Sequence, residues 1–155
     1  EDSVNSSGVQ LKIINSSISG DTTIGGLSRI KNDLATHQPN YVLVELGGND
    51  ALRGYPIDKI KNNLLKIIDA TFQAEANPII MQIRIPPNYG KKYVAAFESI
   101  YSEIAAEKNI PKMTFLLEKV ALDKSLMQLD GIHPNQKAQQ IIAEQVKKEL
   151  LSIFK

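Results

Sequence analysis

The chain has 155 residues, of which 43% are hydrophobic and 23% charged, and its 18 basic and 17 acidic residues leave a net charge of +1. This length predicts one domain spanning residues 1–155, and the even spread of charge argues against a nucleic-acid partner. The lack of cysteine excludes disulfides, thiolate metal sites and a cysteine nucleophile, and no apolar run approaches the ~20 residues of a membrane span.

The first half of the chain alternates short apolar runs with helical patterns. Its opening residues, EDSVNSSG, lack the basic and apolar segments of a signal peptide. Residues 9–14 (VQLKII) predict a strand, and residues 23–37 predict a helix. Residues 41–46 (YVLVEL) form a nearly continuous apolar run, which is typical of a strand that is buried on both faces.

The second half continues the alternation. Helices are predicted over residues 57–76, 92–108 and 135–154, and strands over residues 78–83 and 113–117. Alternation of this kind indicates βαβ units, and therefore a parallel sheet covered by helices on both faces. In such sheets ligands bind outside the carboxyl ends of the strands, so the segments that follow the strands are where we expect the chemistry.

Two glycine-containing segments follow the predicted strands. In GGND, Asn49 or Asp50 either caps the next helix or, for Asn49, donates a side-chain hydrogen bond into a cleft. In SGDTT, Asp21 or Thr22 caps a helix, and the backbone amide of Gly20 is a candidate donor to an anion.

The segment DGIHPN is more specific. Asp130 is close enough in sequence to accept a hydrogen bond from one ring nitrogen of His133, which would leave the other nitrogen free as a base. Pro134 stiffens the turn, and Asn135 is placed to cap the last helix. An oriented imidazole together with amide donors is the apparatus of acyl transfer.

Taken together, four segments carry a family resemblance: NSSISGDTT, VLVELGGNDALRG, MQIRIPPNYG and DGIHPNQKAQ. Through them the chain resembles the SGNH (GDSL-type) hydrolases over nearly its whole length, and especially the bacterial branch of acyl-CoA thioesterases, arylesterases and lysophospholipases. The resemblance implies Gly20 and Asn49 as oxyanion-hole donors, and Asp130 and His133 as the acid and base of a Ser-His-Asp triad.

The resemblance also implies a fold and a substrate site. The fold would be a flavodoxin-like three-layer α/β/α sandwich, and the site would use no metal and no cofactor. The protein would act on a small-molecule acyl ester or thioester bound in a shallow groove. It would work in the periplasm or outside the cell. The loop over residues 50–56 would move with ligand, and the loop over residues 84–90 would line the acyl groove. The substrate-binding residues implied are Asp50, Arg53, Ile85, Pro86 and Tyr89.

The chain departs from the family pattern at the nucleophile. The strand and GDSL-like turn that carry the serine have no counterpart, and the nearest imitation, Glu1-Asp2-Ser3, has no strand before it. We therefore expect the first strand of the sheet to be missing and the 155 residues to be inactive alone. Because an unpaired strand edge invites association, the empty slot would favour self-association or a partner's strand.

Three hypotheses about function are compatible with these features. The favoured one is most of a serine esterase without its nucleophile block. The second is an esterase of the same superfamily that acts on carbohydrate or aryl acetyl esters. The third is a non-catalytic flavodoxin-like binding domain. Binding of a nucleotide or flavin would require a glycine-rich phosphate loop, and the sequence does not contain one.

Overall fold

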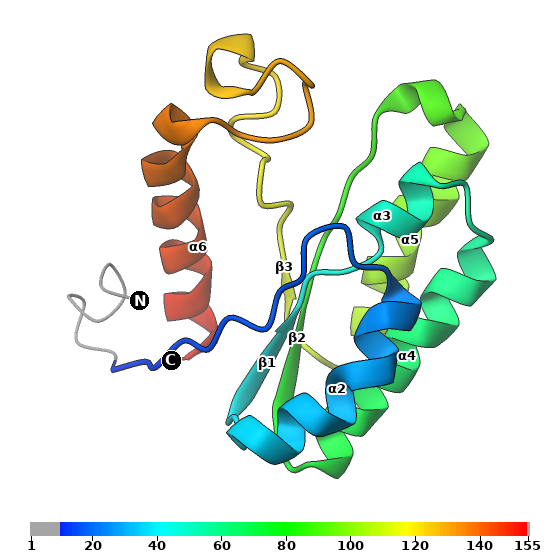
Figure 1. Ribbon diagram of the computed structural model, residues 1–155, viewed down its shortest axis with the longest axis vertical. Helices are drawn as coiled ribbons and strands as arrows, with labels where there is room; N and C mark the ends of the chain where they lie inside the picture. The colour runs from blue at the N-terminus through cyan, green and yellow to red at the C-terminus, as the bar shows by residue number, and fades with distance from the viewer. Residues whose placement is uncertain (1–9, 155) are drawn as a thin grey trace. The chain divides into compact units, whose positions relative to one another are not determined.

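The computed structural model describes residues 10–154 (Figure 1). These residues fall into two compact units. One unit is Asn15–Met113, and the other joins the described parts of Glu1–Ile14 and Thr114–Lys155. One domain over residues 1–155 remains a prediction.

The Asn15–Met113 unit is built on a parallel sheet. Within the described residues its strands are β1 (Tyr41–Val44), β2 (Asn77–Met81) and β3 (Lys112–Met113), in the order β1-β2-β3. Tyr41 lies opposite Asn77, and Ile80 lies opposite Lys112. The predicted α/β class with a parallel sheet is therefore confirmed.

Helices connect these strands. They are α2 (Thr23–His37), α3 (Gly48–Leu52), α4 (Ile57–Gln73) and α5 (Lys91–Lys108), with a 3₁₀ turn, η1 (Pro87–Tyr89), before α5. Helix α4 packs against α2, α5 and β2, and α5 also contacts β2 and β3. Figure 1 shows α2, α4 and α5 lying side by side next to the sheet.

The core of this unit follows from the apolar period of α4. Ile60, Leu64, Ile67 and Ile68 recur at helical spacing, and all four are buried. From α5, Phe97 and Tyr101 add an edge-to-face aromatic pair with ring centroids 5.5 Å apart. This packing holds the end of β1, which Gly47 and Asn49 follow.

The second unit contains η2 (Lys124–Leu126), η3 (Gln136–Ala138) and α6 (Gln139–Ile153). Asn135 caps η3, since its side-chain oxygen accepts from the Lys137 backbone N–H at 2.9 Å. A small core of Val120, Ala138 and Ile142 holds the unit together. No helix in the described part of the chain has both the length and the apolar character needed to cross a membrane.

Two strand predictions were wrong. Residues 10–14 of the predicted strand 9–14 belong to no strand, and residue 9 lies outside the described residues. An apolar alternation favours extended backbone, but a strand also needs a continuous hydrogen-bonded ladder, which the pattern cannot guarantee. The predicted strand 113–117 is instead Lys112–Met113.

The second error has a local cause in α6. The backbone N–H of Thr114 donates to the Glu149 carboxylate at 2.7 Å, and the Phe115 carbonyl accepts from the Gln145 amide at 2.9 Å. The Thr114 N–H and the Phe115 carbonyl are therefore hydrogen-bonded to side chains of α6, and they are not available to extend the ladder with β2.

Candidate active site

The turn before α2 contains Gly20, Asp21 and Thr22. Gly20 has φ +75°, in the left-handed region that favours glycine, and Asp21 N–H donates to the Ile18 carbonyl at 3.1 Å. Thr22 is the N-cap of α2, because its hydroxyl accepts from the Gly25 N–H at 3.4 Å. Of the two capping residues that the sequence allowed, the structure selects Thr22.

A second glycine turn joins β1 to α3. Gly47 has φ +110°, and a Cβ there would lie 2.6 Å from the Tyr101 hydroxyl oxygen. That hydroxyl donates to the Leu46 carbonyl at 2.9 Å. Burial, followed by the charges of Asp50 and Glu45, raises the Tyr101 pKa well above its ordinary value, so the hydroxyl stays a donor. Only glycine fits here, and this turn sets the position of Asn49.

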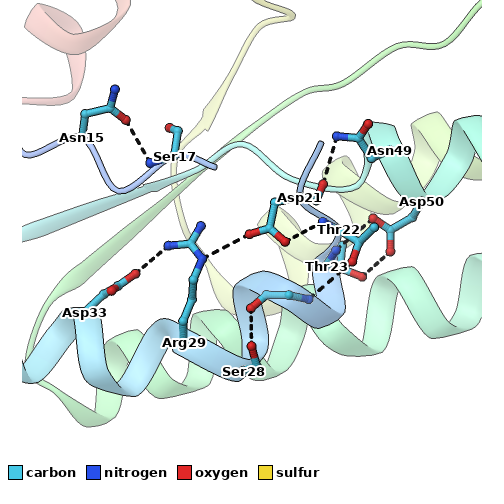
Figure 2. Close-up of polar contacts among 11 residues, drawn as sticks. Asn15, Ser17, Asp21, Thr22, Thr23, Ser28, Arg29, Asp33, Asn49 and Asp50 are labelled. Atoms are coloured by element: carbon cyan, nitrogen blue, oxygen red, sulfur yellow. Dashed lines mark hydrogen bonds and ion pairs between the residues drawn. The ribbon is translucent and has the colours of Figure 1, made fainter. Parts of the chain in front are cut away.

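Helix α3 bonds to the turn before α2 (Figure 2). The Asn49 side-chain amide donates to the Asp21 carbonyl at 2.9 Å, and the Arg53 guanidinium donates to the Gly20 carbonyl at 3.3 Å. The structure therefore brings Asn49 to the Gly20 turn, although the two residues are far apart in sequence. One glycine turn and one amide side chain share the end of this sheet.

Asp50 lies beneath this contact and is 1% exposed. Its two carboxylate oxygens accept from the Thr23 N–H at 2.9 Å and the Thr23 hydroxyl at 2.6 Å, as Figure 2 shows. The Asn63 side chain of α4 donates to the same hydroxyl at 3.0 Å. The structure thus places Asp50 inside the unit, bonded to protein groups.

An ion pair also holds the same turn. The Asp21 carboxylate is 3.1 Å from the Arg29 guanidinium and also accepts from the Thr22 N–H at 2.8 Å. Arg29 reaches Asp33 at 2.6 Å, one helical turn further along. A Cβ on Gly25 would overlap the Asp21 carboxylate, at 1.8 Å, so the glycine makes room for it.

In the second unit, Asp130 and His133 form a turn closed by their own hydrogen bonds. One carboxylate oxygen of Asp130 lies 2.8 Å from His133 Nδ1, and the other accepts the backbone N–H groups of Ile132 and His133 at 2.9 and 3.0 Å. Gly131 supplies φ +67° at the bend. An ionised Asp130 holds the proton on Nδ1 and leaves the lone pair on Nε2.

The flanking residues fix this turn on both sides. Gln128 N–H donates to the His133 carbonyl at 2.8 Å, and Met127 and Pro134 form an antiparallel bridge. The Asn135 side chain donates to the Ser125 and Met127 carbonyls. The imidazole is therefore held on a closed loop and is still 68% exposed.

The hydrogen bonds to Asp130 lower its pKa from 3.8 to about 2; the His133 backbone N–H contributes most, and the His133 side chain comes next. A lowered carboxyl pKa stabilises the fold above pH 3.8, and that stabilisation is lost as pH falls towards 2. We expect a carbon-detected NMR titration to place the Asp130 midpoint near 2.

His133→Ala should raise that midpoint only part of the way to 3.8, because the residue-133 backbone N–H still donates. Asp123, whose pKa is lowered by Ser125, is the internal control and should not move. A full return to 3.8 would show that the side chain alone holds the carboxylate.

The implied acyl-groove residues differ in exposure. Ile85 is buried in the hydrophobic core, Pro86 is half-buried, and Tyr89 is 38% exposed at the end of η1. Of the three, Tyr89 offers the most surface to a ligand.

No serine in the described residues has the setting of a nucleophile. The segments between each strand and the next helix, residues 45–47, 82–86 and 114–123, contain no serine. Ser3 lies outside the described residues.

Sequence reasoning identified Gly20, Asn49, Asp130 and His133, but it missed the supporting side chains. Thr23, Arg29 and Asn63 hold the site residues in place, and their positions carry no sequence signal beyond ordinary helix composition. Within each unit the predicted pairs do come together: Asn49 with the Gly20 turn, and Asp130 with His133.

The chain is similar to known proteins over most of its length. Residues 3–141 match the GDSL-like Lipase/Acylhydrolase family. The chain is 47% identical over 138 residues to thioesterase 1/protease 1/lysophospholipase L1 of Escherichia coli (strain K12), covering 89% of this chain and 66% of that protein. It is 46% identical over 144 residues to an arylesterase of Vibrio mimicus, covering 93% and 72%. The chain thus spans about two thirds of the length of the Escherichia coli relative.

The chain is also similar in structure to a solved esterase. The psychrotrophic esterase EstA from Pseudoalteromonas sp., inhibited by monoethylphosphonate, matches with a TM-score of 0.94 at 37% identity. The match covers 97% of this chain and 82% of that one.

Proposed function

Because the chain belongs to the GDSL-like lipase/acylhydrolase family, we propose that the protein hydrolyses acyl esters and thioesters by a Ser-His-Asp mechanism. The substrate classes are acyl thioesters, aryl esters and lysophospholipids, which appear in the names of the thioesterase, arylesterase and lysophospholipase relatives. By resemblance, it would work in the periplasm or outside the cell.

The observation that carries the proposal is the pairing of Asp130 with His133 Nδ1 at 2.8 Å. It fixes the tautomer in which Nε2 can accept a proton, and Asp130 stays ionised at any pH well above 2. Nothing about a merely structural turn requires an exposed imidazole to be oriented in this way. The arrangement fits a general base that later returns its proton to the leaving group.

Asn49 supports the second part of the proposal, an oxyanion hole. Its side-chain nitrogen carries two hydrogens, and one is directed to the Asp21 carbonyl. That bond orients the amide and leaves the second N–H for a ligand. Together with the Gly20 backbone N–H, it would donate to the oxygen on which negative charge develops.

These groups define the sequence of steps. His133 Nε2 takes the proton of the nucleophilic serine hydroxyl as its oxygen attacks the ester carbonyl, and the carbonyl oxygen becomes an oxyanion. As the tetrahedral species collapses, the protonated imidazole gives its proton to the departing alcohol or thiol. Water, deprotonated by the same imidazole, then releases the acid and regenerates the serine.

The groove is the finer part of the proposal. We place Pro86 and Tyr89 along the acyl chain, with Tyr89 presenting an exposed aromatic face. Arg53, which already bonds the Gly20 carbonyl, is placed at the edge of the oxyanion site. An acetyl esterase would need little of the groove formed by Pro86 and Tyr89, because an acetyl group is short. Preference for acyl-chain length therefore distinguishes a long-chain hydrolase from an acetyl esterase.

The test is hydrolysis by two forms of the protein. The first is the 155-residue chain, and the second carries an upstream strand–GDS–helix segment. We expect the second form to hydrolyse p-nitrophenyl butyrate and palmitoyl-CoA and to label with a fluorophosphonate probe. The first form should do neither, because no described serine has the nucleophile setting.

One outcome would contradict the proposal, and a second would overturn only the expectation that the 155-residue form lacks a nucleophile. Absence of hydrolysis and labelling in both forms would favour a non-catalytic binding domain. Activity of the 155-residue form that Ser3→Ala abolishes would make Glu1-Asp2-Ser3 the nucleophile turn. A panel of esters from acetate to palmitate, measured on the active form, distinguishes a long-chain hydrolase from an acetyl esterase.

A further inference from the structure

Asp50 is buried, and both of its carboxylate oxygens accept hydrogen bonds. Its carboxylate accepts from the Thr23 N–H and the Thr23 hydroxyl, at 2.9 and 2.6 Å. Thr23 is the first residue of α2 and is itself fully buried. Asp50 therefore joins α3 to the start of α2 inside the unit.

The partners of Asp50 in the described residues include no Lys, Arg or His side chain. Its carboxylate instead lies at the amino end of α2, where backbone N–H groups lack partners within the helix. The charge reaches its neighbours, because it adds to burial in raising the pKa of both Tyr93 and Tyr101. A buried carboxylate maintained in this way is costly unless its hydrogen bonds are kept.

A third element orients the contact. Asn63 of α4 donates to the Thr23 hydroxyl oxygen at 3.0 Å, so the hydroxyl hydrogen is directed to Asp50. The chain of bonds runs from α4 through Thr23 to α3.

The consequence falls on the neighbouring residue. Asn49 precedes Asp50 in the five-residue helix α3, and its amide reaches the carbonyl of Asp21, two residues before Thr23. The two adjacent side chains therefore hold residues 21–23 at two points (Figure 2). The bonds of Asp50 to Thr23 hold the backbone of α3 beside residues 21–23, where the Asn49 amide reaches the Asp21 carbonyl.

We propose that Asp50 is a positioning residue, which acts through Thr23 to hold the Asn49 amide and the Gly20 turn in the geometry of an oxyanion hole. The inference rests on the proposed function. It assigns Asp50 no contact with substrate, in contrast to the substrate-binding role that the family resemblance implied.

The experiment uses the form that carries the upstream strand–GDS–helix segment, together with four single variants of it. Asp50→Asn keeps the shape but replaces one acceptor with a donor, and Thr23→Val removes the hydroxyl. Both should lower kcat by ~10- to 100-fold, the scale of a misplaced catalytic group. KM should change by less than about twofold, because the donors act mainly in the transition state. Thr23→Ser keeps the hydroxyl and should retain near-normal kcat. Asp58→Asn removes an exposed carboxylate of α4 and serves as the charge control.

The kcat of the double variant Asp50→Asn/Thr23→Val should be little lower than that of the less active single variant, because both changes remove the same contact. Thermal unfolding of every variant separates loss of fold from loss of turnover. Normal kcat in a folded Asp50→Asn variant, with an active wild type, would overturn this inference and leave the proposed function intact. A raised KM with unchanged kcat would return Asp50 to substrate binding. A wild type without esterase activity would overturn both.

Discussion

Replacing His133 with alanine in the form that carries the upstream strand–GDS–helix segment should lower kcat by about 10⁴- to 10⁶-fold, the largest loss that we expect from any single change. The imidazole Nε2 is the only base that the proposed mechanism assigns to the serine, and it also protonates the leaving group. Its exposure and its bond to Asp130 show a side chain that is held but not buried. A purely structural role would therefore predict little effect on turnover. Hydrolysis of p-nitrophenyl butyrate under saturating substrate is the measurement.

Asp130 should act through the same imidazole. Asp130→Ala removes the acceptor for Nδ1–H and two backbone bonds of the turn, and the double variant with His133→Ala should be little worse than His133→Ala alone. His37→Ala is the matched control, because that exposed histidine ends α2 and the proposed mechanism gives it no role. Multiplicative losses in the double variant would mean that Asp130 serves another group.

What the sequence predicts well is local. The helix 23–37 is predicted to the residue, because a capping threonine precedes an apolar period and Gln38 ends it in the left-handed region. The pairing of Asp130 with His133 is likewise visible, since only two residues separate them. In both cases the interacting groups lie within one turn of chain.

What the sequence misses depends on long-range partners. The strand predicted at 113–117 ends at Met113, because Gln145 and Glu149 bond the backbone that follows. Asp50 looks like a helix cap in sequence, yet its partner is Thr23, at a sequence distance of 27 residues. Neither partner can be read from the pattern, because periodicity reports which face is buried and not which side chain lies opposite.

The same limit bears on Asn49, whose two sequence interpretations were a cap and an oxyanion donor. The structure gives it no capping bond: α3 follows Gly47 without a side-chain cap, and the amide instead reaches the Asp21 carbonyl. A residue that only stabilised this turn would contribute about 1 kcal/mol through that hydrogen bond. A residue that also donates to the oxyanion would matter far more to turnover than to folding.

Asn49→Ala should therefore lower kcat by ~10²–10³-fold while changing KM little, because it removes one preorganised donor to the charge that develops in the tetrahedral species. The free energy of unfolding should fall by about 1 kcal/mol, the contribution of the bond to Asp21. Asn62→Ala, at an exposed position of α4, is the matched control: it should leave kcat and KM unchanged and should not lower the free energy of unfolding, because alanine is the better helix former. Steady-state kinetics and urea unfolding on the same preparations provide the comparison. If Asn49→Ala loses the expected stability but keeps near-normal turnover, the amide serves only to hold the turn, and the oxyanion must be stabilised by other donors.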